Sequence, residues 1–156
     1  MTQIEESLIG FELFRDLDSE HLSALASGAG LRVFRADEYL LAAEQPADAI
    51  YAIRSGRVAI EIDGGNRGPV IIETIGSGDV VGISWLLPPY RWTFGARAVD
   101  DVEAVRLDAV ALRELCDEQP VFGYELYKRF TRLIHRRLVA TRLRVIDLYG
   151  MDGQKS

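Results

Sequence analysis

The sequence contains few of the residues that form covalent cross-links and metal sites, with one cysteine and two histidines among 156 residues. A single cysteine excludes a disulfide within the chain and any metal site built from several thiolates. His21 and His135 are far apart in the sequence, so a zinc or iron site has little to build on. We interpret Cys116 as a small buried residue of a helix rather than a redox sensor, because no basic residue closer than Arg113 is present to favour its thiolate.

Long apolar runs are also missing. The longest uncharged run, Val80 to Tyr90, is too short to cross a bilayer and contains Pro88 and Pro89. The N-terminus has neither the basic flank nor the apolar core of a signal peptide. We therefore expect a cytoplasmic protein that does not associate with a membrane.

Catalytic and nucleotide-phosphate motifs are absent as well. Ser84 lies in Gly-Ile-Ser-Trp-Leu, which lacks the second glycine of a nucleophile elbow, and neither histidine is in a motif that pairs it with a base. The glycine-rich segment 76–79 is not followed by Lys-Ser or Lys-Thr, so it is not a P-loop. The sequence thus predicts a protein that is not an enzyme.

What is present is typical of one globular domain over residues 1–156. The chain is 48% hydrophobic and 27% charged, and its length is sufficient for a core of its own. The formal net charge of −6 argues against binding of nucleic acid by the surface as a whole.

The middle of the chain, 31–107, has the period of β-strands. Apolar residues alternate with other residues, as at Val58, Ile60 and Ile62, and Gly, Pro, Asn and Asp clusters separate the runs. No helix of ten to fifteen residues interrupts the strands, so a parallel α/β sheet is not expected. Several short strands at this spacing predict a β-sandwich or barrel, with a jelly roll among the options.

Helices are predicted on both sides of the strands. Residues 1–30 form a short helical lead-in, in which Asp18 is a candidate N-cap. Asp108 can cap a short helix over 109–117 within the C-terminal helical region 108–149. From Val121 to Leu148 apolar residues recur in steps of three and four, which predicts one long helix of about 40 Å.

This long helix carries an apolar stripe that a small barrel cannot cover completely. The stripe contains Tyr127, Phe130, Ile134, Leu138, Thr141 and Val145. Pairing with a second copy of the chain about a twofold axis is the simplest way to bury it, so we expect a homodimer through this helix. The alternative is a helix that folds back on its own barrel.

The same helix is rich in positive charge. Its cations are Lys128, Arg129, Arg132, Arg136, Arg137, Arg142 and Arg144, against Glu125 and Asp147. They form either a binding surface for an acidic partner or nucleic acid, or a solvated face that offsets the acidic barrel. The basic face has no interleaved aromatic residues for stacking on bases, which favours the solvated face.

Two motifs in the strand region resemble a known family. Residues 48–58 read Asp-Ala-Ile-Tyr-Ala-Ile-Arg-Ser-Gly-Arg-Val, and 76–82 read Gly-Ser-Gly-Asp-Val-Val-Gly. They are similar to a strand hairpin and a strand end of cyclic-nucleotide-binding domains, the sensor modules of the catabolite activator family. The likeness runs from about Phe11 to Tyr149. It implies a mainly β fold, a double-stranded β-helix (jelly-roll) barrel, with short N-terminal helices, a helix in the phosphate-binding cassette and a long C-terminal dimerisation helix.

The resemblance also implies a mode of action. Regulators of the family continue into a winged helix-turn-helix domain, whereas a tail over 150–156 is too short to read DNA. Segments 85–92 and 137–143 are similar to those of stand-alone bacterial members. We therefore expect a non-enzymatic, homodimeric sensor module that does not bind DNA directly and acts on a protein partner.

The cassette, 82–98, departs from the family pattern at two positions. The family binds the ribose with a glutamate and the cyclic phosphate with an arginine and backbone N–H groups. An ungapped comparison puts Ile83 at the glutamate position and Trp92 at the arginine position. Arg91 lies one residue early, so in an extended strand it would point away from the pocket unless a bulge turned it inward. We expect the usual binding of cyclic AMP to be lost.

The cassette residues Gly82, Ile83, Ser84, Arg91, Trp92 and Thr93 are the candidate ligand-binding residues. Three hypotheses remain for them. In the first, the protein is a structural dimer and its own side chains fill the pocket. In the second, the pocket binds another small ligand, which has an aromatic face and an anionic or polar group that contacts Arg91 or Thr93. In the third, the pocket binds cyclic AMP or cyclic GMP through a shifted Arg91. No catalytic residue, metal or obligatory cofactor is predicted.

Overall fold

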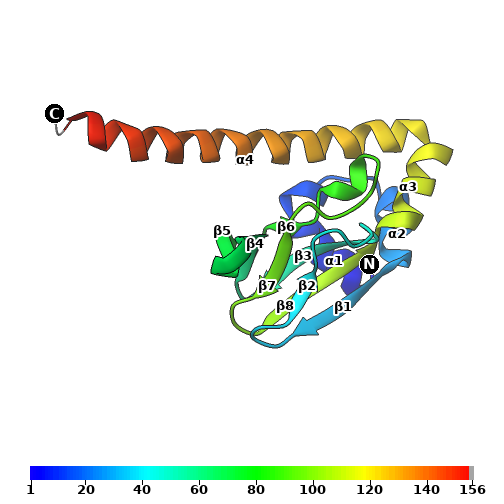
Figure 1. Ribbon diagram of the computed structural model, residues 1–156. Helices are drawn as coiled ribbons and strands as arrows, with labels where there is room; N and C mark the ends of the chain where they lie inside the picture. Colours follow the sequence, from blue (N-terminus) through cyan, green and yellow to red (C-terminus); the bar gives the residue numbers. More distant parts are fainter. Residues whose placement is uncertain (155–156) are drawn as a thin grey trace.

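The computed structural model describes residues 1–154 and contains two four-stranded antiparallel sheets with helices at both ends of the chain (Figure 1). The first sheet has the order β1 (Ala29–Phe34), β8 (Val102–Asp108), β3 (Ala49–Ser55), β6 (Val80–Val81). The second has the order β2 (Tyr39–Leu41), β7 (Gly95–Ala98), β4 (Val58–Asp63), β5 (Pro69–Ile75). The predicted mainly β, jelly-roll fold is confirmed, and its strands begin two residues earlier than predicted, at Ala29.

The central strands of the first sheet are buried on both faces. In β3 the side chains from Ala49 to Ile53 are all buried, and in β8 Val102, Ala104, Val105 and Leu107 are buried. One face of this sheet packs toward the second sheet, and α1 (Gln3–Ile9) contacts β8 and β1. Two-sided burial explains why apolar residues in β3 are nearly continuous rather than strictly alternating.

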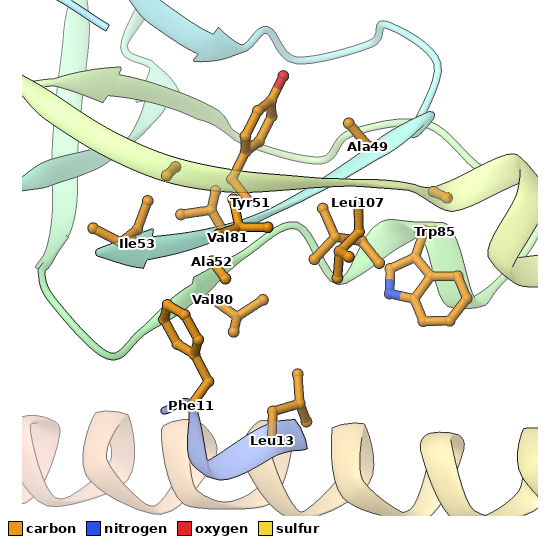
Figure 2. Packing of buried hydrophobic residues seen from close by; sticks show 14 of the residues in the cluster. Phe11, Leu13, Ala49, Tyr51, Ala52, Ile53, Val80, Val81, Trp85 and Leu107 are labelled. Atoms are coloured by element: carbon orange, nitrogen blue, oxygen red, sulfur yellow. The ribbon is translucent and has the colours of Figure 1, made fainter. Parts of the chain in front are cut away.

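The N-terminal lead-in is anchored between the barrel and the last helix. It contains α1, the 3₁₀ turn η1 (Glu12–Phe14) and α2 (Ser19–Ser27). Figure 2 shows Phe11 and Leu13 directed from this segment toward the sheet, with the long helix on its other side. Asp18 is the N-cap residue of α2, as predicted, but its side chain makes no capping hydrogen bond and lies 3.7 Å from Nδ1 of His21.

Two helices follow the barrel. The carboxylate of Asp108 accepts hydrogen bonds from the backbone N–H groups of Val110 and Ala111 and so begins α3 (Ala109–Glu118), as predicted. Then α4 (Pro120–Gln154) runs as one helix of 35 residues, about 52 Å, and continues past the barrel (Figure 1). The predicted helix is shorter, because it ends at Leu148, before Gly150, whereas α4 continues through Gly150 and Gly153. The last residues of the predicted tail, 155–156, lie outside the described residues.

The first half of α4 packs on the barrel of its own chain. Phe122, Leu126 and Phe130 are fully buried there. Phe130 contacts the indole ring of Trp85 at a centroid distance of 5.2 Å. The prediction that Phe130 belongs to a surface for a second copy is therefore wrong, since this side chain completes the core of its own chain.

Several cations of α4 make contacts within the chain. Arg129 pairs with Glu125 at 3.0 Å and donates to the backbone carbonyl of Leu13. Arg136 pairs with Glu12 at 2.7 Å. These arginines hold the N-terminal segment against α4, so this part of the basic face is neither wholly solvated nor available to a partner.

Among residues 1–154 no helix has the length and apolar character needed to cross a bilayer.

Candidate functional site

A cavity of about 190 Å³ opens between the second sheet, the cassette and α4. Its lining comes from distant parts of the chain: Leu41, Ile60, Ile72, Glu73, Val81, Gly82, Ile83, Ser84, Trp92, Thr93, Phe94, Gly95 and Arg137. Most of these side chains are apolar or aromatic. Because the cavity remains open, the side chains of the protein do not fill it, and we take it as the candidate functional site.

Five of the six predicted site residues line this cavity. Gly82 follows the short strand β6, and its φ of +103° is one that residues with a side chain rarely adopt. A Cβ atom there would lie 2.7 Å from the Trp92 ring, so only glycine permits this close approach. The predicted cassette helix is a single 3₁₀ turn, η3 (Ser84–Leu86).

Trp92 forms one wall of the cavity and is held in place by its backbone. Its N–H donates to the carbonyl of Gln45 at 2.9 Å, and its carbonyl accepts from the N–H of Glu44 at 2.9 Å. Its side chain is 5% exposed. Trp92, which the sequence comparison puts at the arginine position of the family pattern, thus presents an indole to the cavity.

Arg91 is the one predicted site residue that does not line the cavity. It pairs in an antiparallel bridge with Pro46, its side chain is exposed, and its guanidinium donates to the carbonyl of Glu44 at 2.8 Å. Adjacent extended residues point to opposite sides, so Trp92 and Arg91 cannot both face the cavity. No bulge turns Arg91 inward.

Trp85 and Tyr90 of the cassette face the core or α3 rather than the cavity, whereas Phe94 lines the cavity. The ring of Tyr90 lies 4.2 Å from the guanidinium carbon of Arg113. Arg113 also donates to the backbone carbonyls of Trp85 at 3.0 Å and Ala47 at 3.2 Å. These contacts attach the cassette to α3. Together with the backbone hydrogen bonds of Trp92 to Glu44 and Gln45, they hold the cassette at both of its ends.

Arg137 of α4 is a cavity residue that sequence analysis missed. Its guanidinium donates to the backbone carbonyl of Val80, the residue that begins β6. Burial lowers the pKa of Arg137 from its usual value, and the nearby carboxylates of Glu73 and Asp79 partly offset this effect. The only cation of the cavity thus comes from the long helix, not from the cassette.

A signal for Arg137 was present in the helical periodicity. Leu126, Phe130 and Leu133 recur in steps of four and three, and Arg137 and then Ala140 continue this row. An arginine within an apolar row is expected to lie on the side of the helix that faces the protein, so its position indicates a buried or functional role that the charge alone does not. Charge alone places Arg137 with the other cations of the helix, whereas its position in the row places it on the side of α4 that faces the barrel.

A polar cluster around the buried Glu61 connects strands of the second sheet. Glu61 on β4 is buried and pairs with Arg97 on β7 at 2.8 Å, while the hydroxyl of Tyr39 on β2 donates to it at 2.8 Å. The hydrogen bond to Glu61 raises the pKa of Tyr39. Arg97 also pairs with Asp37. Every group has a partner, so we assign this cluster to structure rather than to binding.

Cys116 on α3 is buried, and burial raises the pKa of its thiol to about 11. An unfolded cysteine has a pKa of about 8.5, so at pH 8 the native thiolate fraction should be about two orders of magnitude lower. We expect a disulfide reagent to modify the native protein about a hundredfold more slowly than the urea-unfolded chain. Similar rates in the two states would contradict a buried, inert thiol.

Within residues 1–154 no group of three or more potential ligands is placed to hold a metal ion.

Comparison with known proteins agrees with this fold. Residues 31–119, more than half of the chain, match the cyclic nucleotide-binding domain family, and the chain belongs to this family of regulatory sensor domains. Among solved structures, a protein from Geobacter metallireducens GS-15 superimposes with a TM-score of 0.79 at 24% identity, covering 88% of this chain and 99% of that one. A cyclic nucleotide-binding domain from Methylobacillus flagellatus has a TM-score of 0.75 at 24% identity, covering 92% and 80%.

Curated relatives are longer than this chain. A CRP-like cAMP-activated global transcriptional regulator of Mycobacterium tuberculosis is 27% identical over 153 residues, which are 96% of this chain and 65% of the regulator. An uncharacterized NTE family protein of the same species is 26% identical over 136 residues, which are 86% of this chain and 22% of that protein. The chain therefore corresponds to one part of each of these proteins.

Proposed function

We propose that the chain is a non-enzymatic ligand-sensing module that acts as a homodimer and does not bind cyclic AMP in the usual way of its family. The observation that carries the proposal is the lining of the cavity. Ile83 and Trp92 occupy the positions of the two side chains that hold ribose and phosphate in the family pattern, and Arg91 lies outside.

Size and charge also argue against a cyclic nucleotide. Pockets for drug-sized ligands begin at about 300 Å³, whereas this cavity measures about 190 Å³. Glu73 lines it together with Arg137, so the two side chains supply no net positive charge for a phosphate. Loss of the charge-assisted arginine contact and of the glutamate contact corresponds to about a hundredfold or more in affinity.

A non-enzymatic role fits the surroundings of the candidate nucleophiles. His21 lies against the ring of Phe122 at a centroid distance of 4.6 Å, distant in the chain from the cavity lining, and Cys116 is buried with a raised pKa. The hydroxyl of Ser84 lines the cavity without a histidine or second serine beside it among the described lining residues. A nucleophile paired with a base is the minimum for covalent catalysis.

Homodimer formation is supported by the second half of α4, where apolar side chains remain exposed. These are Ile134, Leu138, Val139, Leu143, Val145, Ile146, Leu148 and Tyr149. Ile134, Leu138, Val145 and Tyr149 share one side of the helix, and an exposed apolar stripe of this kind is typical of a helix that pairs with a partner. Of the predicted interface residues, Ile134, Leu138, Thr141 and Val145 lie on this half, and Tyr127 is only partly exposed beside Trp85.

Calorimetric titration with cyclic AMP and cyclic GMP tests the proposal. We expect no heat of binding at micromolar concentrations of nucleotide, for the wild type and for Arg91→Ala alike. Micromolar binding that disappears in Arg91→Ala would establish a cyclic-nucleotide receptor that works through Arg91 and would overturn the proposal. Because Arg91 makes only one surface hydrogen bond, the variant is expected to keep the fold.

A further inference from the structure

Two side chains of opposite charge line the cavity, Arg137 from α4 and Glu73 from β5. Neither of them forms an ion pair with any residue in the range 1–154. Both side chains are only partly exposed. Glu73 and Asp79 are near enough to Arg137 to favour its charge but form no direct ion pair with it, so a cavity lined by one such cation and one such anion is suited to a ligand that supplies both countercharges.

The guanidinium of Arg137 has donor capacity to spare. It carries five N–H groups, and the backbone carbonyl of Val80 is the one acceptor it reaches within the described part of the chain. The group stays protonated at neutral pH even where burial disfavours its charge. A carboxylate in the cavity would accept from these remaining donors in a charge-assisted, bidentate manner.

Glu73 determines which anions can enter. A ligand with only a carboxylate would be attracted by Arg137 and repelled by Glu73. A ligand with only an ammonium group would be attracted by Glu73 and repelled by Arg137. A molecule that carries both groups gains at both side chains. Selection against each singly charged analogue is therefore built into the charge pattern of the cavity.

The walls and volume define the rest of the ligand. Ile60, Val81, Trp92 and Phe94 provide an apolar and aromatic surface around the charged pair. Cavities of about 150 Å³ hold a benzene-sized ring, and this cavity measures about 190 Å³. The space fits a body of amino-acid size and is too small for a nucleotide.

We infer that the cavity binds a small apolar zwitterion, an amino acid with an aliphatic or aromatic side chain, with its carboxylate on Arg137 and its ammonium group on Glu73. The inference rests on the proposed function, because it names the ligand class for the same sensing cavity. It places one ligand contact on α4, so occupancy of the cavity is connected directly to the helix that carries the exposed apolar patch.

Three probes test the inference on the wild-type protein: L-phenylalanine, 3-phenylpropionate, which lacks the ammonium group, and phenethylamine, which lacks the carboxylate. Calorimetry and the fluorescence of Trp92 report binding. We expect phenylalanine to bind about tenfold or more tightly than either analogue. Equal affinity for the three probes, or no binding of phenylalanine at millimolar concentration, would overturn the inference.

Two variants assign the groups. Arg137→Met should abolish the preference for phenylalanine over phenethylamine, and Glu73→Gln should abolish the preference over 3-phenylpropionate. Arg136→Met is the matched control, because Arg136 is the next residue of α4 but pairs with Glu12 outside the cavity, and it should keep both preferences. If Arg137→Met does not fold by circular dichroism, the wild-type comparison and Glu73→Gln still decide the outcome.

The outcomes for the two proposals are separable. Micromolar binding of cyclic AMP would overturn the proposed function. Absence of cyclic AMP binding together with equal or absent binding of the three probes would leave the sensing module in place and overturn only the zwitterion.

Discussion

Replacement of Trp85 by alanine is expected to lower the free energy of unfolding by about 3–5 kcal/mol. Trp85 is fully buried in the cassette turn and lies edge-on to Phe130 at 5.2 Å and to Tyr127 at 5.8 Å. It therefore joins the cassette to α4, and its removal leaves a large cavity between them. Urea unfolding followed by circular dichroism measures the loss.

Trp85→Phe and Leu87→Ala are the controls for this experiment. The indole N–H of Trp85 has no hydrogen-bond partner among the described residues, so phenylalanine removes an unsatisfied donor while it keeps an aromatic ring. We expect it to cost less than half of the alanine change. Leu87 is 71% exposed, and its replacement should change stability by no more than about 0.5 kcal/mol. A Trp85→Ala loss as small as that of Leu87→Ala would contradict the packing described.

The double change Ile134→Glu and Leu138→Glu is expected to convert a dimer into a monomer. The two residues are 37% and 45% exposed and lie one helical turn apart on the outward face of α4. Two carboxylates in an apolar helix pair lose their hydration and repel their copies, which should raise the dimer dissociation constant about a hundredfold or more. Light scattering on a size-exclusion column measures the mass.

Val121→Glu is the matched control for the dimer experiment. Val121 is an apolar residue of the same helix and is 82% exposed, but it lies in the first turn, away from the proposed interface. This variant should keep the mass of the wild type. A wild-type protein that elutes at the monomer mass would remove the dimer proposal altogether.

Much of the fold is predictable from local sequence pattern. The period-two region from Leu31, the turn residues between runs, the Asp108 cap and the absence of proline after Pro120 each correspond to an element of the structure. These signals act within a few residues. Glycine is not a certain end signal, since α4 continues through Gly150 and Gly153, and the helix predicted to end at Leu148 is accordingly too short.

The candidate site was predictable only in part, for a physical reason. Alternation along one strand is enough to place Trp92 toward the cavity and Arg91 away from it. The positions of Glu73 and Arg137 depend instead on how β5 and α4 come together in space. The assignment of Phe130 to a partner surface has the same cause. Periodicity identifies an apolar row on a helix, but it does not tell whether the barrel of the same chain or a second chain buries that row.

The single long helix also has a mechanical consequence. Arg137 and Tyr149 are twelve residues apart on α4, about 18 Å along its axis. An α-helix without a break transmits a rotation over that distance almost without loss. A tilt of about 10° about Arg137 would therefore move Tyr149 by about 3 Å, more than half the rise of a helical turn. The stretch of α4 beyond Arg137 thus connects the cavity, where Arg137 lies, to the exposed apolar residues as far as Tyr149.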